Sequence, residues 1–244
     1  MASFIGQPMF PVDFLRPTRA SFDNIGNSID GGVNGVGESI TSELAGGGMI
    51  TATYERMVLQ GPDERHEVIN WLGARLNGGY RFINVPIVND KIGAFPIING
   101  AVRPIVSGIP HSDGSYFDDG SGYSQATVYG EITAQAGLRA GIISVRVYGA
   151  SRTVFRWSDW FSIYHDVKGW RAYRSWDLLS VTDETNPVYQ IAISPPLRQA
   201  VSVGTRVELA RPTCVMKLRR GETVPWDYEG WYQSRPSINF VEAF

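Results

Sequence analysis

The chain has 244 residues, of which 43% are hydrophobic and 19% are charged, and its formal net charge is −2. This composition is that of a folded protein with a sizeable core, and the slightly acidic balance argues against a nucleic-acid binder. A single cysteine, Cys214, excludes an internal disulfide and a cysteine-built zinc site, and the lack of an apolar run of about 20 residues excludes a membrane-spanning helix.

The first 20 residues place proline and other turn formers around apolar side chains, and they predict an extended arm that ends in a strand. Such an arm cannot stabilise itself, so we expect it to lie on its own domain or on a neighbouring subunit. Met1–Phe4 has no basic residue before a long apolar stretch, which indicates no secretion signal. We therefore expect a protein that is made in a cytoplasm and used without export.

Residues 23–37 contain five glycines among Asn, Ser and Asp, and they predict a loop or a flexible hairpin. A phosphate-binding loop would end in Gly-Lys-Ser or Gly-Lys-Thr and lead into a helix. Here Gly37 is followed by Glu38. The sequence therefore does not favour a phosphate site.

The segment Met49–Leu59 alternates apolar and polar side chains, which predicts a strand. An acidic, proline-led start then predicts one amphipathic helix at about 62–77, with Val68, Leu72 and Leu76 on its apolar face. Two glycines end this helix, and β structure resumes after them.

Residues 96–135 differ in character from the chain on either side and predict an inserted hairpin or loop. Their central part is polar, rich in glycine and dotted with aromatic residues, which is typical of an exposed loop. Asp113, Asp118 and Asp119 offer oxygen ligands for calcium, but their spacing is not that of a calcium loop with its distal glutamate. We expect a solvated loop, and ion binding by these three carboxylates stays an open alternative.

From Thr127 to Leu218 the chain consists of short runs of alternating apolar and polar side chains. Because no helical crossovers separate the later strands, we expect the sheets to be mostly antiparallel. The predicted fold is therefore mainly β, of the β-sandwich class, with a single helix. Cys214 falls within one of these strand patterns, where a small buried hydrophobic residue is expected.

An enzyme needs chemical groups that converge in an active site, and the sequence identifies no such set of residues. His66, His111 and His165 fall on the polar side of the helix, in a loop and at a turn, where surface or turn roles are typical. Neither Gly-x-Ser-x-Gly nor His-Glu-x-x-His occurs, and the 24 acidic residues allow too many carboxylate pairs to choose one. We expect no catalytic residue, no metal site and no cofactor.

Aromatic residues gather in two segments. Residues 221–244 are rich in aromatics and lack strand alternation, and burying each ring is worth roughly 1.5–3 kcal/mol. We expect this C-terminal tail to clamp onto its own domain or onto the next subunit. The aromatics of residues 157–176 are expected to be mostly core residues or cross-strand pairs, with one or two at a subunit contact.

An ordered set of motifs spans most of the chain outside residues 96–135. The set comprises Gly169-Trp170-Arg171-Ala172-Tyr173-Arg174, Ile193-Ser194-Pro195-Pro196-Leu197-Arg198, Gly204–Glu208, Phe10-Pro11, Phe14–Thr18, Gly46–Gly48 and Phe240–Phe244. This set resembles the distal tail protein family, structural proteins of the tail tip of long-tailed, siphovirus-like bacteriophages. The strand pair, helix and return strand of residues 49–87 are similar to phage tail-tube-like domains, by analogy alone.

The resemblance implies a virion protein of the tail tip or baseplate, assembled in the cytoplasm of the host bacterium. It implies a homo-oligomeric ring, of six copies, that joins the tail tube protein to the tail hub protein and gives a tail fibre or receptor-binding protein a docking surface. The ring-forming, tail-tube-like domain would cover residues 1–95 plus 136–244, with 96–135 as an insertion and 221–244 as an aromatic clamp. The candidate subunit contacts are Phe10, Phe14, Leu15, Trp226, Tyr228, Trp231, Phe240 and Phe244.

Two other functions stay open at this point. A carbohydrate-binding or receptor-binding β-sandwich on the virion would use a tryptophan near residues 157–176, and its substitution would abolish saturable glycan binding. A cell-wall hydrolase ranks below both, and zymography on peptidoglycan is expected to show no clearing.

Overall fold

The computed structural model describes residues 3–26, 28–43, 46–60, 63–88, 95–150, 155–156, 159–182, 185–225 and 233–244. Strands make up 48% of the chain and helices 9%, and the sheets are antiparallel, so the predicted mainly-β fold class is confirmed. The chain divides into two compact units. The first comprises Met1–Ile87, His165–Arg171 and Thr213–Phe244, and the second comprises Val88–Tyr164 and Ala172–Pro212.

This division differs from the predicted one, in which residues 96–135 were an insertion into a single domain. Strand β11 (Tyr129–Ile132) lies inside that predicted insertion, yet it pairs with β12 (Ile142–Tyr148) and β16 (Arg206–Glu208). Residues 96–135 therefore belong to the same unit as the later strands, because β11 completes their sheet.

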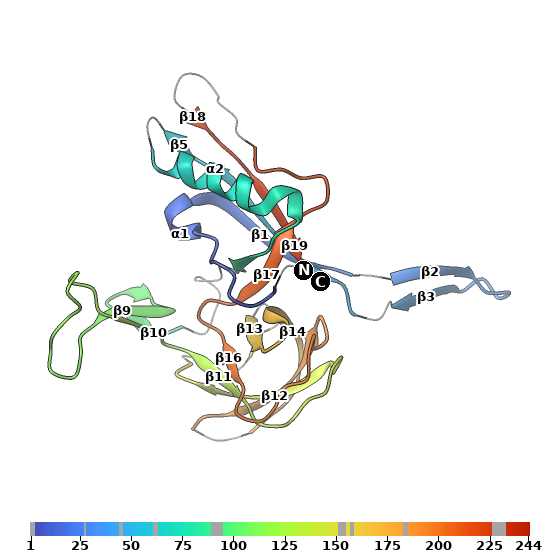
Figure 1. Ribbon diagram of the computed structural model, residues 1–244. Helices are drawn as coiled ribbons and strands as arrows, with labels where there is room; N and C mark the ends of the chain where they lie inside the picture. Colours follow the sequence, from blue (N-terminus) through green and yellow to red (C-terminus); the bar gives the residue numbers. More distant parts are fainter. Residues whose placement is uncertain are drawn as a thin grey trace. The chain divides into compact units, whose positions relative to one another are not determined.

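The first unit is built on a five-stranded antiparallel sheet (Figure 1). The second strand of this sheet alternates apolar and polar side chains, so its apolar face lies in the core. Ile50, Ala52 and Tyr54 on that face are fully buried. The strands run in the order β1 (Pro17–Ile25), β4 (Met49–Met57), β19 (Ile238–Glu242), β17 (Thr213–Leu218) and β6 (Ile83–Pro86).

The N-terminal arm lies on its own unit. Phe4 stacks on Phe82 with ring centroids 4.9 Å apart, and the short helix α1 (Val12–Leu15) buries Leu15. The N–H of Phe10 donates to the carbonyl of Asn84 (2.7 Å), and the Asn84 N–H donates to the carbonyl of Pro8 (2.9 Å). These two bonds cover the outer edge of β6.

The C-terminal tail contains strands, which corrects the expectation of an irregular segment. Strand β19 lies in the sheet between β4 and β17, with Ile238 and Phe240 buried. Strand β18 (Gln233–Ser234) pairs with β5 (Leu59–Gln60). The tail therefore packs on its own unit. The alternating pattern of β19, which was not recognised as a strand, is only five residues long.

The predicted helix is confirmed as α2 (Arg65–Leu76), followed by the 3₁₀ turn η1 (Asn77–Gly79). Its buried face consists of Ile69, Leu72 and Leu76. Val68, which was predicted on that face, is only half-buried, and Trp71 is exposed. The left-handed conformation of Asn77 ends the helix. No helix in the described part of the chain is long and apolar enough to cross a membrane.

The second unit contains a closed six-stranded barrel in place of the predicted sandwich. Its interior is filled by alternating side chains such as Val145, Ile191 and Val207, and the Tyr173 hydroxyl accepts the N–H of Arg198 at 3.1 Å. The strand order is β11, β12, β15 (Val188–Ser194), β14 (Gly169–Val181), β13 (Trp160–His165) and β16.

Three further hairpins form two-stranded sheets of their own (Figure 1). The predicted loop or hairpin at 23–37 overlaps the first of them, which extends to Glu43, and the exposed loop between Ile109 and Tyr123 joins the strands of another. The pairs are β2 (Ser28–Val33) with β3 (Ser39–Glu43), β7 (Ile97–Ile98) with β8 (Ala101–Val102), and β9 (Ile105–Ile109) with β10 (Tyr123–Ala126).

Candidate functional site

The β2–β3 hairpin exposes apolar side chains that no other described residue of its unit covers. Ile29, Val33, Val36 and Ile40 are each at least half exposed, and Val36 reaches 83%. At the tip, the Asn34 side-chain oxygen accepts the N–H groups of Val36 and Glu38, so the turn is closed by its own hydrogen bonds. A two-stranded hairpin alone is marginally stable in water, so this hairpin needs a surface to lie on.

Three glycines join this hairpin to the sheet. Gly46, Gly47 and Gly48 all have positive φ, a region that other residues rarely adopt. A Cβ on Gly48 would lie 2.3 Å from the carbonyl oxygen of Ile25, where the two chains of the hairpin enter β1 and β4. Position 48 therefore requires glycine, because any Cβ there would clash with the backbone of β1.

The two edges of the five-stranded sheet differ. The outer edge of β6 is covered by the N-terminal segment, whereas no strand of the described residues pairs with the outer edge of β1. Strand β1 is nine residues long, and most of its side chains are exposed. An open edge of this length presents backbone donors and acceptors to any second chain.

Charge also differs between the two sides of this sheet, apart from Arg19, which is exposed on β1. From Ala20 to Tyr54 the chain carries four acidic residues and no Lys or Arg. On the other side, the register that pairs Met216 with Ile83 brings the start of β6 beside the end of β17. Three exposed arginines flank these two strand ends: Arg81, Arg219 and Arg220.

The structure separates the eight predicted subunit contacts. Phe10, Leu15 and Phe240 are at most 1% exposed, so they belong to the core of their own unit and the prediction is wrong for them. Phe14 and Phe244 are exposed and stay candidates. Trp226, Tyr228 and Trp231 lie outside the described residues.

Phe14 also borders a hollow of about 400 Å³ beside helix α2. Trp71 and Val68 give this hollow an apolar lining, and Glu64 and Glu67 add two carboxylates. The exposed Trp71 thus belongs to a surface feature.

The aromatic segment 157–176 is only partly core, and Trp170 within it is half-buried. Tyr173 is fully buried and Trp160 is 8% exposed, while Tyr164 and Trp176 are exposed at separate positions on β13 and β14. Trp157 lies outside the described residues. The predicted glycan-binding alternative needs one accessible tryptophan in this segment, and the exposed Trp176 meets that need, so this alternative stays a prediction.

The three histidines belong to three different elements: α2, the β9–β10 loop and the end of β13. Among the described residues, no group of three His, Cys, Asp or Glu side chains is placed to hold a metal ion. Burial, with a smaller effect from the positive charge of Arg171, lowers the pKa of His165 to about 4. His165 is therefore neutral inside the folded first unit over the usual pH range.

This buried histidine predicts a specific loss of stability in acid. Its folded pKa lies below its ordinary value of 6.5, so the unfolded chain takes up a proton first, and stability falls as the pH drops from about 6.5 towards 4. Between pH 7 and pH 4.5 this group should cost about 2 kcal/mol of unfolding free energy. Urea unfolding of the protein and of His165→Gln at several pH values measures it: the substitution should flatten the slope in this window. Equal slopes would contradict the prediction.

The loop between β9 and β10 contains a short repeat that sequence reasoning missed. Asp-Gly-Ser occurs at residues 113–115 and again at 119–121, and each aspartate accepts the N–H of the serine two residues on. Hydrogen bonds from the side chain of each serine, and then from its N–H, lower the pKa of both aspartates below their ordinary value. Aromatic rings recur at the same six-residue spacing and pack edge to face, with centroids 4.8 to 5.1 Å apart: His111, Phe117 and Tyr123.

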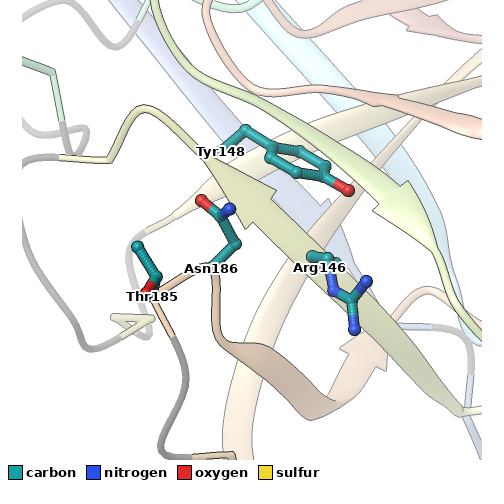
Figure 2. Close-up of a pocket in the computed structure, with 4 residues that line it drawn as sticks. All are labelled: Arg146, Tyr148, Thr185 and Asn186. Atoms are coloured by element: carbon teal, nitrogen blue, oxygen red, sulfur yellow. The ribbon is translucent and has the colours of Figure 1, made fainter.

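The outer face of the barrel holds a second cluster of aromatic and charged side chains. Tyr129 stacks on Tyr148 with centroids 5.0 Å apart and planes 22° apart, and the Arg206 guanidinium lies 4.9 Å from the Tyr129 centroid. The Tyr148 hydroxyl donates to Glu131 at 3.3 Å. Beside Tyr148 lies a hollow of about 440 Å³, which is also lined by Arg146, Thr185 and Asn186 (Figure 2).

Comparison with known proteins gives no family to which this geometry could be referred. No protein-family model matches the chain, and no curated protein matches it either.

Proposed function

We propose that this chain is a structural protein of a bacteriophage tail tip, which assembles into a ring of six copies between the tail tube protein and the tail hub protein. The observation that carries the proposal is the β2–β3 hairpin, whose exposed apolar residues need a surface that its own unit does not supply. The order of motifs that resembles distal tail proteins supports the same role, and a tail fibre or receptor-binding protein would dock on the ring.

The contrast between the two sides of the sheet supports a head-to-tail contact. The acidic hairpin and the open edge of β1 lie on one side, and the covered edge of β6 and the three exposed arginines lie on the other. A contact that joins two different surfaces repeats from copy to copy, and it gives a ring when the rotation closes. In this proposal the hairpin of one copy contacts the arginine-bearing side of the next.

The mass of the protein in solution tests this function. Light scattering or native mass spectrometry should give a multiple of 27.0 kDa for the intact chain, with six copies expected. Replacing residues 28–43 by a short Gly-Ser linker should reduce the protein to a folded monomer, because it removes the contact without touching the sheet. The same replacement of residues 110–122, in the β9–β10 loop, is the matched control and should leave the mass unchanged.

Charge reversal examines the direction of the contact. Arg219→Glu with Arg220→Glu should also give a monomer, and assembly of the unaltered chain should weaken as salt is raised, because exposed charges are screened. A monomer at every concentration of the intact chain, or a hairpin replacement that keeps the assembled mass, would refute the proposed ring.

A further inference from the structure

We propose that the hollow beside helix α2 is a docking site for an arginine side chain of a partner protein. This inference does not rest on the proposed ring, because the residues that line the hollow are not those of the β2–β3 hairpin or of the arginine-bearing side. It starts from helix spacing. Four of the lining residues follow one another at i, i+3, i+4 and i+7, so they form a single stripe along α2, next to its buried face: Glu64, Glu67, Val68 and Trp71.

The aromatic part of the hollow is held on an anchored surface. Phe14 belongs to α1, whose other two apolar residues are buried, so the short helix is fixed to its unit while Phe14 stays 42% exposed. Trp71 is 45% exposed, and the Arg75 guanidinium lies 5.6 Å from the centroid of its ring. Arg75 in turn donates to the side-chain oxygen of Gln7 at 3.2 Å. Exposed aromatic side chains on a rigid support are typical of a contact with another molecule, because little conformational entropy is lost when they are covered.

Charge selects a cation as the group that enters the hollow. The charged residues of the lining are Glu64 and Glu67, and neither side chain has a hydrogen bond or ion pair with another described residue. Both lie at the start of α2, where the helix dipole supplies only about half a positive charge. The nearest cation in sequence, Arg65, is paired with Asp63 at 2.6 Å.

The charges of the two helices that border the hollow give the same sign. Residues 12–16 and 63–76 contain four acids and three arginines, which sum to −1 with His66 neutral: Asp13, Asp63, Glu64, Glu67, Arg16, Arg65 and Arg75. The two unpaired carboxylates of the lining therefore face a surface that does not neutralise them, and a cationic side chain is complementary to it.

A guanidinium suits this lining better than an ammonium does. Its planar fork can donate two parallel hydrogen bonds to one carboxylate, and its face can pack on an aromatic ring, as that of Arg75 already does on Trp71. The volume of about 400 Å³ leaves room for the apolar stem of the side chain as well. In the proposed complex the stem packs on Phe14 and Trp71, and the guanidinium bonds to Glu64 and Glu67.

Fluorine NMR of the full-length protein, labelled with fluorotryptophan, tests this site through Trp71 itself, whose signal is the one lost in Trp71→Phe. Titration with the peptide acetyl-Leu-Arg-Leu-amide should shift this signal to saturation. The same peptide with citrulline in place of arginine has nearly the same shape and no charge, and it should bind about fivefold more weakly.

Variants of the protein locate the contact. Glu64→Gln together with Glu67→Gln should weaken binding of the arginine peptide to the level of the citrulline peptide. Asp118→Asn, which removes an exposed carboxylate of the second unit, is the matched control and should leave binding unchanged.

Several outcomes would overturn the inference. A Trp71 signal that does not move at millimolar arginine peptide would show that the hollow binds no such side chain. Equal binding of the arginine and citrulline peptides, or undiminished binding by the double glutamine variant with its melting temperature unchanged, would remove the role of the two carboxylates. A Trp71 signal that shifts with protein concentration alone would assign the hollow to a second copy of this chain. Because the ring is measured by mass and this site by the Trp71 signal, either proposal can fail while the other stands.

Discussion

Replacing Arg171 by methionine is expected to lower the free energy of unfolding by about 3–5 kcal/mol, because it leaves a buried carboxylate without its partner. The Nη1 atom of Arg171 lies 3.2 Å from Oε1 of Glu242, and both side chains are fully buried in the first unit. Urea denaturation at neutral pH, with the glutamate ionised, measures the loss. The melting temperature should fall with it.

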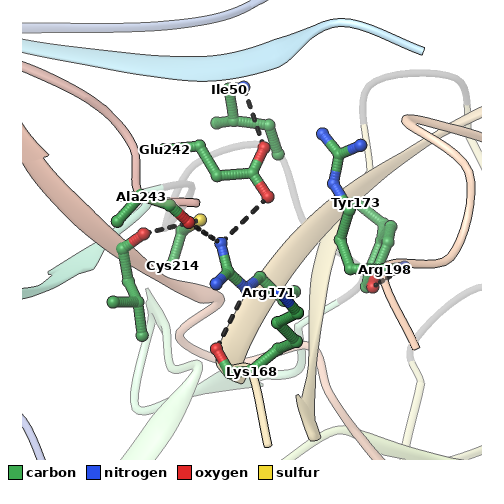
Figure 3. Close-up of polar contacts among 9 residues, drawn as sticks. Ile50, Lys168, Arg171, Tyr173, Arg198, Cys214, Glu242 and Ala243 are labelled. Atoms are coloured by element: carbon green, nitrogen blue, oxygen red, sulfur yellow. Dashed lines mark hydrogen bonds and ion pairs between the residues drawn. The ribbon is translucent and has the colours of Figure 1, made fainter. Parts of the chain in front are cut away.

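The size of this effect follows from what the arginine holds together (Figure 3). Nη1 of Arg171 also donates to the carbonyl of Ala243 (2.6 Å), and Nε donates to the carbonyl of Lys168 (3.0 Å). Glu242 in turn accepts the N–H of Ile50 at the start of β4. The guanidinium also lies 5.1 Å from the ring of Phe4, so one side chain joins both ends of the chain to the sheet.

An exposed ion pair in the same unit gives the matched control. Arg19 and Glu55 lie 3.4 Å apart on the surface, so Arg19→Ala should cost less than about 1 kcal/mol. The double variant Arg171→Met with Glu242→Leu should recover part of the loss, because no unpaired charge is then buried. Equal costs for Arg171→Met and Arg19→Ala would show that the buried pair does not hold the termini.

Local sequence patterns were sufficient where a single element decides its own structure. The alternation of β4 and the apolar spacing of α2 each follow from contacts between near neighbours in sequence, and both elements form as predicted. The same reasoning placed a loop or hairpin at 23–37, because glycine and asparagine act locally.

These local patterns could not predict which strands pair when the strands are distant in sequence. Strand β17 lies beside β6, about 130 residues away in sequence, and no periodicity in either strand names its partner. The barrel was missed for the same reason, because an alternating strand is equally suited to a sandwich or to a closed sheet.

The candidate sites show the same limit. Phe10 and Phe240 were assigned to subunit contacts because they lie near the chain ends, yet their rings meet in one core, with centroids 5.2 Å apart. The cluster of Tyr129 and Tyr148 depends on a register that only the folded barrel supplies. By contrast, the repeated Asp-Gly-Ser of the β9–β10 loop was visible in the sequence.

Gly149→Ala is expected to destabilise the barrel unit by about 2–5 kcal/mol, from a left-handed backbone and a steric clash together. Gly149 has a φ of +73°, and a Cβ there would lie 2.1 Å from the carbonyl oxygen of Thr127, which is backbone and cannot rotate away. Two other glycines separate the contribution of the left-handed backbone from that of the steric clash. Gly204 has a φ of +85° with only a side-chain atom nearby, at 3.6 Å, so its alanine variant should cost about 1–2 kcal/mol. Gly137 has open space, so Gly137→Ala should be neutral or slightly stabilising. Thermal unfolding of the three variants measures this order, and a Gly149→Ala protein as stable as the Gly137→Ala protein would contradict the close approach of Gly149 to Thr127.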